Sequence, residues 1–396
     1  MDRIDRFTSL GFGLFVHFGL YSRVGKGEWY LRLCPEADRD AYEALSASFS
    51  VRPGWAASLV RLARRTGCRY ITLTTRHHDG FSLYDTCGLS DYDAVHSACG
   101  RDLVREFTDA CRAGGITPMF YHTLLDWHHP DYTGNFRNYI DYLCNSTEIL
   151  CRRYGPVGGF WFDGMWDRPD ENWQEDRIYG IIRRYQPDAV IINNTGLSEQ
   201  GKVGHPEIDG VTFERGDPRR PDSTGRKRAG EMCQVLCDHW GYAANDCNYK
   251  PVGQLIEDLT QCRRFGCNYL LNTGLRGDGS PDPTDRQILG ELGKWVRQNR
   301  EALFGTHPSD LSCGEAALLT DGRYTYAIIS DVPMSADPNV TLSGDLRTVF
   351  PGRAVVEGVW LDDGSPVSIS SDGSLVVTPF PYGRSMHSRV ARLILA

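Results

Sequence analysis

From the N-terminus to about residue 300, short apolar runs alternate with stretches in which apolar residues recur at helical spacing. Trp55–Thr66 places Leu59, Leu62 and Ala63 on one helix face, and the β-branched run Tyr70–Thr75 follows it directly. Comparable runs predict strands at Gly11–His17, Tyr70–Thr75, Thr117–His122, Gly158–Asp163, Ala189–Asn193, Val211–Glu214, more weakly near Val235–Trp240, and at Asn268–Asn272. The stretches between them predict helices at Trp55–Thr66, Asp102–Ala113, Phe136–Tyr154, Trp173–Tyr185, Val252–Phe265 and Asp285–Gln298. This alternation is typical of a parallel sheet with helices outside it, closed as a (β/α)8-like (TIM) barrel.

The pattern changes after Leu303. Short β-rich runs are separated there by turn sequences such as Thr320-Asp-Gly and Asp362-Asp-Gly, without helical periodicity. The runs are Ala316–Leu319, Tyr324–Ile329, Ala354–Trp360, Leu375–Val377 and Val390–Leu395. We therefore predict an α/β barrel domain in residues 1–303 and a C-terminal antiparallel β-sandwich domain in residues 304–396. No Pro-rich linker separates them, so we expect the two domains to pack together.

The stretch from Ser198 to Asn248 is the hardest part of the barrel to assign, because it is rich in glycine, proline and charge. We predict that it forms long loops on the side of the barrel that carries the chemistry.

The net charge of -8 is mild, and the basic residues are scattered along the chain, which argues against nucleic acid as a partner. No apolar run reaches the roughly 18 residues of a membrane span, so we expect no membrane partner. The charged start Met1-Asp-Arg-Ile-Asp-Arg lacks the apolar core of an export signal. We expect a cytoplasmic location, although a truncated secreted form would look the same. The oligomeric state is left open.

The 13 cysteines are dispersed, and several lie within helical patterns, which indicates reduced, small apolar side chains. Cys233 and Cys237 lack a second metal-ligand pair, so their spacing does not favour a zinc site.

Polar side chains stand at the carboxyl ends of successive predicted strands: His17, His77-His78, Tyr121-His122, Asp163, Asn193-Asn194 and Glu214. In a parallel barrel these ends meet at one face, where ligand pockets form. Asp163 ends the aromatic run Gly158–Gly164, where a desolvated carboxylate needs partners or the developing positive charge of a substrate. The alternative is that Asp163 caps the following helix.

The adjacent residues His77 and His78 raise the question of a metal. Neighbours in an extended segment point to opposite sides, so this pair lacks the spacing of two ligands on one strand. We therefore predict ligand contacts and no metal. A Ser-nucleophile elbow, a Gly-x-Gly-x-x-Gly fingerprint and a phosphate loop are missing, which argues against esterase, dinucleotide and nucleotide chemistry. The remaining carboxylates, aromatics and neutral hydrogen-bonding side chains are the set that a sugar pocket uses.

A series of motifs between about residues 10 and 300 resembles the α-L-fucosidases of glycoside hydrolase family 29. The motifs are Gly13-Leu-Phe-Val-His-Phe-Gly-Leu-Tyr-Ser, Glu28-Trp-Tyr, Leu73-Thr-Thr-Arg-His-His-Asp-Gly-Phe, Phe120-Tyr-His-Thr-Leu-Leu-Asp-Trp-His-His-Pro-Asp-Tyr, Trp161-Phe-Asp-Gly, Glu231-Met-Cys, Trp240-Gly-Tyr and Asn268-Tyr-Leu-Leu-Asn. The architecture of that family, a β/α barrel followed by a β-sandwich, agrees with the division drawn from the sequence pattern.

The resemblance implies a retaining exo-α-L-fucosidase that hydrolyses terminal α-L-fucose from fucosylated glycans, through a covalent intermediate and without a cofactor. It implies that Asp163 is the nucleophile of the catalytic domain. Substrate contacts are implied for His17, Glu28, Trp29, His77, His78, Tyr121, Trp161, Glu231 and Trp240. A related retaining glycosidase acting on α-L-galactosides is one alternative.

The chain departs from the family pattern after the fifth strand. Many members read Asn-Asp-Arg-Trp where this chain reads Asn193-Asn194-Thr195-Gly196, so the arginine that faces the sugar is missing at Thr195. Arg215 is a candidate replacement. The missing arginine leaves open a second alternative, a fucose-binding protein with lapsed catalysis.

Two glutamates are candidates for the general acid/base. Glu214 ends a predicted strand ahead of the Glu-Met-Cys motif, whereas Glu231 lies within the motif; we favour Glu214. Linkage specificity stays open, because it depends on the unassigned loops, above all Ser198–Arg228.

Overall fold

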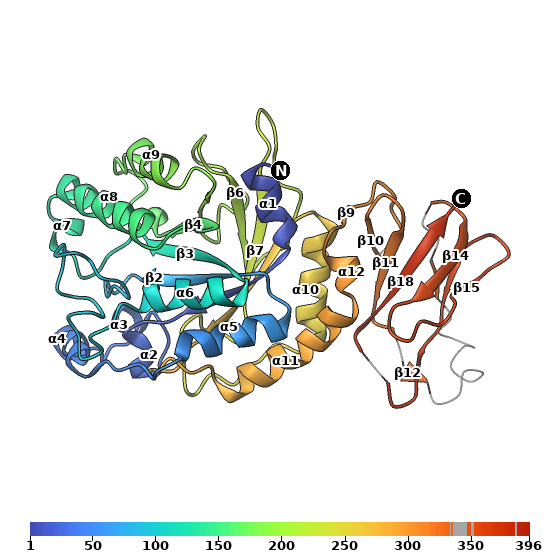
Figure 1. Cartoon of the computed structure of the whole chain (residues 1–396), viewed down its shortest axis with the longest axis horizontal. Coiled ribbons are helices and arrows are strands. Elements are labelled where there is room, and N and C mark those ends of the chain that lie inside the picture. Colours follow the sequence, from blue (N-terminus) through green and yellow to red (C-terminus); the bar gives the residue numbers. More distant parts are fainter. Residues whose placement is uncertain (315, 333, 336–346, 350–351, 385) are drawn as a thin grey trace.

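The computed structural model describes residues 1–314, 316–332, 334–335, 347–349, 352–384 and 386–396. Eight parallel strands close into a barrel in sequence order (Figure 1). Their bounds are β1 Phe12–His17, β2 Tyr70–Arg76, β3 Thr117–Thr123, β4 Gly159–Asp163, β5 Val190–Asn193, β6 Gly210–Glu214, β7 Ala229–Val235 and β8 Asn268–Gly274. The strands are buried almost throughout, because side chains cover both of their faces. The predicted barrel is confirmed.

Helices follow most of the barrel strands and cover the outside of the sheet. The longer ones are α5 Trp55–Thr66, α6 Leu103–Gly114, α8 Phe136–Arg153, α9 Glu175–Tyr185, α10 Val252–Arg264 and α11 Pro283–Gln298. Shorter turns lie in the connections between strands: α2 Tyr21–Val24, α3 Tyr30–Leu33, α4 Arg39–Glu43, η1 Ala44–Ser48, α7 Pro130–Thr133 and η2 Met165–Asp167. Among the described residues, no helix combines the length and apolar character needed to cross a membrane.

The bounds of α6 show how the sequence sets these helices. The side chain of Asp102 accepts a hydrogen bond from the backbone N–H of Arg105 at 2.9 Å, which satisfies one of the free donors of the first turn. Gly115 ends the helix in the left-handed conformation with a φ of 65°, which glycine adopts without a steric penalty. The connections 194–209 and 215–228, both fully described, contain no helix. Loops therefore cover the barrel on either side of β6.

The N-terminal helix α1 (Arg3–Leu10) packs against β5 and β7 and contributes to the barrel interior. Ile4 and Phe7 join the core cluster inside the barrel, where the Phe7 ring meets the edge of Tyr70 at a centroid distance of 5.6 Å. Arg3 forms an ion pair at 3.0 Å with the buried carboxylate of Asp209. Through Ile4 and Phe7, the helix thus adds apolar side chains to the core inside the barrel.

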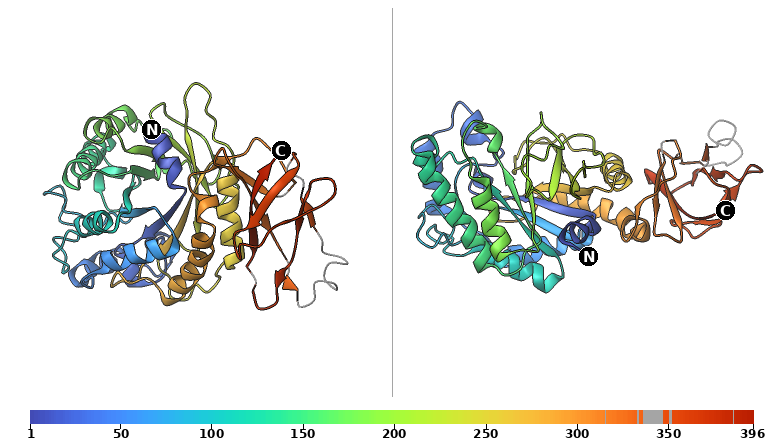
Figure 2. Two further views of the ribbon diagram at one scale, coloured as in Figure 1. Left: turned by 45° about the vertical axis from the view of Figure 1, so that its right-hand side comes forward. Right: turned by 90° about the horizontal axis from the view of Figure 1, so that it is seen from above.

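Beyond α12 (Arg300–Leu303) the chain forms a smaller β domain beside the barrel (Figure 2). Its sheets are ordered β14-β18-β11-β10-β9 and β13-β16-β15, with a short parallel pair β12-β17. The bounds are β9 His307–Pro308, β10 Ala317–Thr320, β11 Thr325–Ser330, β12 Met334–Ser335, β13 Arg347–Val349, β14 Val355–Trp360, β15 Ser368–Ile369, β16 Leu375–Val377, β17 Phe380–Pro381 and β18 Ser388–Leu395.

The two larger sheets of this domain share one apolar core, as a β-sandwich requires. Leu318 and Leu393 of the larger sheet cluster with Leu375 and Val377 of the smaller one. The domain is also tied to the barrel, because the indole N–H of Trp295 in α11 donates to the Ser388 carbonyl at 3.1 Å. The predicted sandwich is confirmed, apart from the short parallel pair.

The seventh strand was misplaced by the sequence pattern. The pattern favoured Val235–Trp240, whereas β7 spans Ala229–Val235. The reason is Glu231, a carboxylate in the middle of a strand that is buried along its whole length. A buried carboxylate is rare without partners, and the partners of this one come from distant parts of the chain.

The close packing inside the barrel leads to a prediction for Gly13 in β1. A Cβ at this position would overlap the ring of Tyr70, which is fully buried and holds Glu231 through its hydroxyl. Gly13→Ala should therefore lower stability by about 1–3 kcal/mol through overpacking. Gly180→Ala is the control, because Gly180 is exposed within α9 with nothing within 4 Å of the new Cβ.

The control should be stabilising by about 0.5–1 kcal/mol, since glycine is the poorer helix former. Thermal unfolding followed by circular dichroism compares the two midpoints. An unchanged midpoint in Gly13→Ala would show that the Tyr70 ring does not occupy this space.

Candidate active site

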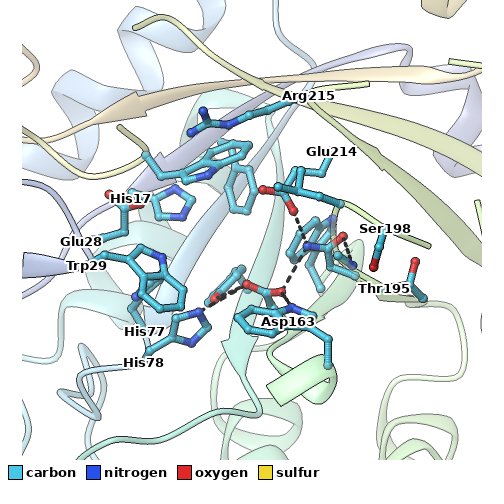
Figure 3. Close-up of a pocket in the computed structure, with 18 of the residues that line it drawn as sticks. His17, Glu28, Trp29, His77, His78, Asp163, Thr195, Ser198, Glu214 and Arg215 are labelled. Carbon is cyan, nitrogen blue, oxygen red and sulfur yellow. Dashed lines mark hydrogen bonds and ion pairs between the residues drawn. The ribbon is translucent and has the colours of Figure 1, made fainter. Parts of the chain in front are cut away.

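A cavity of about 660 Å³ opens at the carboxyl ends of the barrel strands (Figure 3). It is lined by every residue that the sequence assigned to the site except Glu231: His17, Glu28, Trp29, His77, His78, Tyr121, Trp161, Asp163, Glu214 and Trp240. The further lining residues are Phe15, Leu33, Trp166, Asn194, Thr195, Gly196, Leu197, Ser198 and Arg215. The predicted gathering of strand ends into one pocket therefore holds in the structure, except that His122 and Asn193 are buried and do not line the pocket.

The fold delivers these side chains by a simple rule. His17, Asp163 and Glu214 are the last residues of β1, β4 and β6, and Asn194 directly follows β5. Their side chains enter the pocket because the ends of all parallel strands lie at one barrel face. Glu28 and Trp29 come from the long connection after β1, and Trp240 comes from the loop after β7.

Two carboxylates share one amide group. The Asn194 Nδ2 donates to Asp163 Oδ1 at 3.2 Å and to Glu214 Oε2 at 2.8 Å. The orientation of this amide is fixed, because its Oδ1 accepts from the backbone N–H of Gly196 at 3.4 Å and from the Thr212 hydroxyl at 2.8 Å. The nearest oxygens of Asp163 and Glu214 are thus no more than about 6 Å apart.

Asp163 is held by donors on several sides. The Tyr121 hydroxyl donates to Oδ2 at 3.0 Å, and the Trp166 indole N–H donates to Oδ1 at 3.1 Å. With the amide of Asn194, these contacts fix the orientation of the Asp163 carboxylate. A carboxylate held in this way is oriented for attack on a carbon placed above it. The N-capping alternative is not what the structure shows, since α9 begins only at Glu175.

Glu214 has the electrostatics of an acid. Burial, together with the negative charge of Asp163, raises the pKa of Glu214 to about 7. One carboxyl group kept protonated near neutrality beside a second that accepts from several donors is the pattern by which enzymes separate an acid from a nucleophile.

The tautomer of His17 can be assigned from its hydrogen bond with Asn272. The Asn272 Nδ2 donates to the Trp240 carbonyl at 2.7 Å, so its Oδ1 faces His17 Nδ1 at 2.6 Å and accepts the proton on that nitrogen. Burial lowers the pKa of His17 to about 3, so the ring is neutral. His17 therefore presents the lone pair of Nε2 as an acceptor.

His78 is fixed in the same manner. The Thr123 hydroxyl donates to the Leu125 carbonyl at 2.6 Å, so it accepts from His78 Nδ1 at 2.7 Å. Burial lowers the pKa of His78, against the opposing charge of Asp163. The neutral ring directs the lone pair of Nε2 toward the pocket, 3.6 Å from Asp163 Oδ2. This nitrogen is an acceptor for a ligand hydroxyl beside Asp163.

Neutral and aromatic groups complete the walls. The His77 ring stacks on Tyr121 at a centroid distance of 5.5 Å, and burial lowers the pKa of His77 well below its usual range. Burial raises the pKa of Glu28, although the backbone N–H of Gly241 donates to its Oε2 at 2.7 Å. Among the described residues, no group of three or more His, Cys, Asp or Glu side chains is arranged to hold a metal ion.

Glu231 lies beneath the pocket floor, which corrects the expectation that it contacts the substrate. It sits mid-strand in β7 and is fully buried inside the barrel. Its Oε1 accepts from the indole N–H of Trp161 at 2.9 Å, and its Oε2 accepts from the Tyr70 hydroxyl. Burial raises the pKa of Glu231 to about 7. The residue positions Trp161, which forms the floor and stacks on Tyr121.

Arg215 and Thr195 show what stands at the position of the missing arginine. The Thr195 hydroxyl donates to the Glu199 carbonyl at 2.6 Å. Arg215 lines the pocket, but its guanidinium donates to the Asp238 carbonyl at 2.7 Å and lies 5.2 Å from the Trp240 ring centroid. The polar contact between the two carboxylates is instead made by Asn194. The sequence placed Asn194 at a strand end, but nothing in it pointed to this bridge.

Comparisons with known proteins agree with this geometry. The family model described as Alpha-L-fucosidase matches residues 3–301. The tissue alpha-L-fucosidase of Rattus norvegicus is 29% identical over 329 residues, covering 76% of this chain and 70% of the relative. The tissue alpha-L-fucosidase of Homo sapiens is 27% identical over 330 residues, covering 76% and 69%. The solved structure of alpha-L-fucosidase isoenzyme 1 from Paenibacillus thiaminolyticus is 31% identical, with a TM-score of 0.84, and covers 100% of this chain and 99% of that one.

A β/α barrel with two facing carboxylates in one pocket is the arrangement of a glycoside hydrolase. The match over residues 3–301 then specifies the group: the chain belongs to the α-L-fucosidase family.

The contacts of Glu231 generate a prediction for the pocket floor. Glu231→Gln replaces one acceptor oxygen by an amino group, so one of the donors from Trp161 and Tyr70 loses its partner in a dry site. An unsatisfied buried group costs about 1–3 kcal/mol, so kcat/KM should fall by roughly 10- to 100-fold. The loss should be equal for aryl and saccharide leaving groups, because the floor supports both chemical steps.

Tyr70→Phe is the matched variant, since it leaves the bond between Trp161 and Glu231 intact and should cost less activity. Steady-state kinetics and the emission maximum of tryptophan fluorescence provide the readouts. A loss confined to poor leaving groups would assign Glu231 to acid catalysis and contradict the floor role.

Proposed function

We propose that the chain is an exo-acting retaining α-L-fucosidase that hydrolyses terminal α-L-fucose from fucosylated glycans, with Asp163 as nucleophile and Glu214 as acid/base. The observation that carries the proposal is the spacing of the two carboxylates. Their shared amide limits their nearest oxygens to about 6 Å. Retaining glycosidases keep the two groups about 5–5.5 Å apart, whereas inverting enzymes need about 6.5–9.5 Å to fit a water molecule.

In the first step, an oxygen of Asp163 forms a bond to the anomeric carbon of fucose while the bond to the glycosidic oxygen breaks. Glu214 gives its proton to the departing oxygen, so that the leaving group departs as a neutral alcohol. The pKa of Glu214 near 7 keeps that proton available. The products of the step are a fucosyl ester on Asp163 and an ionised Glu214.

In the second step, the ionised Glu214 removes a proton from water as the water oxygen attacks the anomeric carbon. The ester bond breaks, its electron pair returns to Asp163, and fucose leaves with its original configuration. The amide of Asn194 contacts both carboxylates and can follow the negative charge as it moves between them. This role takes the place of an arginine at position 195.

Recognition of the sugar follows from the neutral histidines and the aromatic walls. His17 and His78 offer lone pairs to hydroxyl groups, while Trp29, Trp161 and Trp240 offer ring surfaces to the apolar C–H faces of a sugar. The fixed tautomers mean that a hydroxyl donor is accepted with little reorganisation.

The two alternatives remain distinguishable by experiment. A fucose-binding protein with lapsed catalysis would bind fucose but release nothing from an aryl α-L-fucoside. The coexistence of two closely spaced carboxylates, one with a raised pKa, favours the enzyme. An enzyme for α-L-galactosides would prefer the aryl α-L-galactoside over the aryl α-L-fucoside in the same assay.

Asp163→Asn provides the first test of the roles. The amide cannot form the fucosyl ester, so turnover of an aryl α-L-fucoside should fall by several orders of magnitude while the fold is kept. Asp167→Asn is the matched control. Asp167 lies nearby in η2, but it accepts a hydrogen bond from the Tyr132 hydroxyl and does not line the pocket. Near-normal turnover by Asp163→Asn would exclude it as the nucleophile.

Glu214 generates a prediction about pH. The acid form acts in the first step, so kcat/KM for a substrate with a poor leaving group should decline as the pH rises above about 7. Glu214→Ala should lose this alkaline limb for an activated aryl fucoside, whose leaving group needs little protonation. Burial also raises the pKa values of Asp79 and Glu231 to about 7. The Glu214→Ala variant is therefore needed to show that the decline in kcat/KM comes from Glu214.

A second readout of the same variant is rescue by azide. The fucosyl ester should accumulate on Glu214→Ala because no base activates water. Azide that attacks the ester from the vacated side should restore turnover and yield an α-L-fucosyl azide, the same configuration that water gives in the second step. Glu231→Ala should show no rescue. Rescue of Glu231→Ala instead of Glu214→Ala would exchange the two roles.

A further inference from the structure

A second cavity adjoins the sugar pocket at Leu197 and Ser198, which line both cavities. This groove has a volume of about 740 Å³, within the range of about 300–1,000 Å³ for ligand sites. It lies between the β5–β6 loop and the β6–β7 loop, and it shares Leu197 and Ser198 with the sugar pocket. Figure 3 shows Thr195 and Ser198 on the side of Glu214, opposite His77 and His78.

The groove is built onto the strand that carries Glu214. Gln200, which lines the groove, donates from Nε2 to the Glu214 carbonyl at 2.7 Å. The guanidinium of Arg219 in the β6–β7 loop donates to the Gln200 carbonyl and lies 5.3 Å from the ring centroid of Phe213 in β6. The two loops are therefore joined to each other and to β6, beside the acid/base.

The position of the acid/base gives the groove a direction. A general acid must contact the glycosidic oxygen, so the leaving group lies on the Glu214 side of the fucose. The remainder of a glycan then leads past Glu214, where the two loops form the rim. Leu197, with 65% of its surface exposed, stands at the junction and offers an apolar face to the first sugar of the leaving group.

The lining chemistry suits hydroxyl groups. Among the described residues, Asp217 and Arg219 form no ion pair. Arg219 donates from one guanidinium nitrogen to the Gln200 carbonyl, which leaves its other N–H groups for a ligand. Lys202 pairs with Glu199 at 2.8 Å, so the groove carries charges of both signs. A mixture of donors and acceptors without an excess of one sign fits a neutral, hydroxyl-rich chain better than an anionic or apolar one.

We propose that this groove binds the saccharide leaving group beyond its first residue, which makes the protein selective for fucose on an oligosaccharide over fucose on a single sugar. The inference rests on the proposed function, because it uses the acid role of Glu214. Asp217 and Arg219 are the specificity-determining residues, and they contact the leaving group without taking part in bond cleavage.

The test compares kcat/KM for an aryl α-L-fucoside, a fucosylated monosaccharide and a fucosylated trisaccharide. The wild-type chain should prefer the trisaccharide substrate to the fucosylated monosaccharide. Asp217→Ala and Arg219→Ala should each lower the ratio of trisaccharide to aryl kcat/KM by roughly tenfold, the order expected for a lost hydrogen bond to a charged group. Arg220→Ala is the matched control, since this exposed neighbour does not line the groove and should leave the ratio unchanged.

Direct binding provides a readout that needs no catalysis. The ligand for saturation-transfer NMR is the same trisaccharide without its fucose. It should contact the wild-type chain and Arg220→Ala, and the contact should be reduced in Asp217→Ala. An Asp217→Asn variant keeps the shape of the side chain if the alanine variant fails to fold, and it should show the same reduction.

The outcomes separate the two proposals. If the wild-type chain hydrolyses the aryl fucoside but shows no preference for the longer substrate, or if Arg219→Ala and Arg220→Ala behave alike, the groove proposal is overturned and the activity stands. A parallel loss for the aryl fucoside would also overturn it, because the variants would then act through Glu214. If no fucoside is hydrolysed, the proposed function fails, whereas NMR contact with the trisaccharide would still report on the groove.

Discussion

The amide of Asn194, placed between Asp163 and Glu214, is the contact on which the chemistry of this pocket depends. One planar group donates to both carboxylates, so it sets how far apart they stand. The amide can do so only because its oxygen is occupied by Gly196 and Thr212. The spacing in turn decides whether a water molecule or the carboxylate itself attacks the sugar.

The pocket floor is supported by a continuous series of contacts that begins at the other end of the barrel. Phe7 packs on Tyr70, whose hydroxyl reaches Glu231; Glu231 holds the Trp161 indole, and Trp161 stacks on Tyr121. Tyr121 finally donates to Asp163. A buried carboxylate in mid-barrel is costly by itself, and two donors offset its desolvation. The polar contacts that Glu231 of β7 makes across the barrel with Tyr70 of β2 and Trp161 of β4 thereby support Asp163 from below.

Much of this could be predicted from the sequence, because strands buried on both faces and helices with one apolar stripe leave a clear periodic signal. The prediction that polar residues at the carboxyl ends of the strands meet in one pocket likewise holds for His17, Asp163 and Glu214. The prediction that Glu231 contacts the substrate was wrong. Its partners lie 161 and 70 residues away in sequence, so no local sequence pattern indicates them. The bridge made by Asn194 and the groove beside Glu214 depend on loop conformation, which composition alone does not specify.

The configuration of the first sugar released tests the central claim most directly. The wild-type chain would be mixed with an aryl α-L-fucoside, and the anomeric proton of the product followed by NMR before mutarotation. Two carboxylates held within about 6 Å of each other predict that α-L-fucose appears first and the β anomer only later. Initial appearance of β-L-fucose would mean that water attacks directly, and it would contradict the account of Asp163 and Glu214.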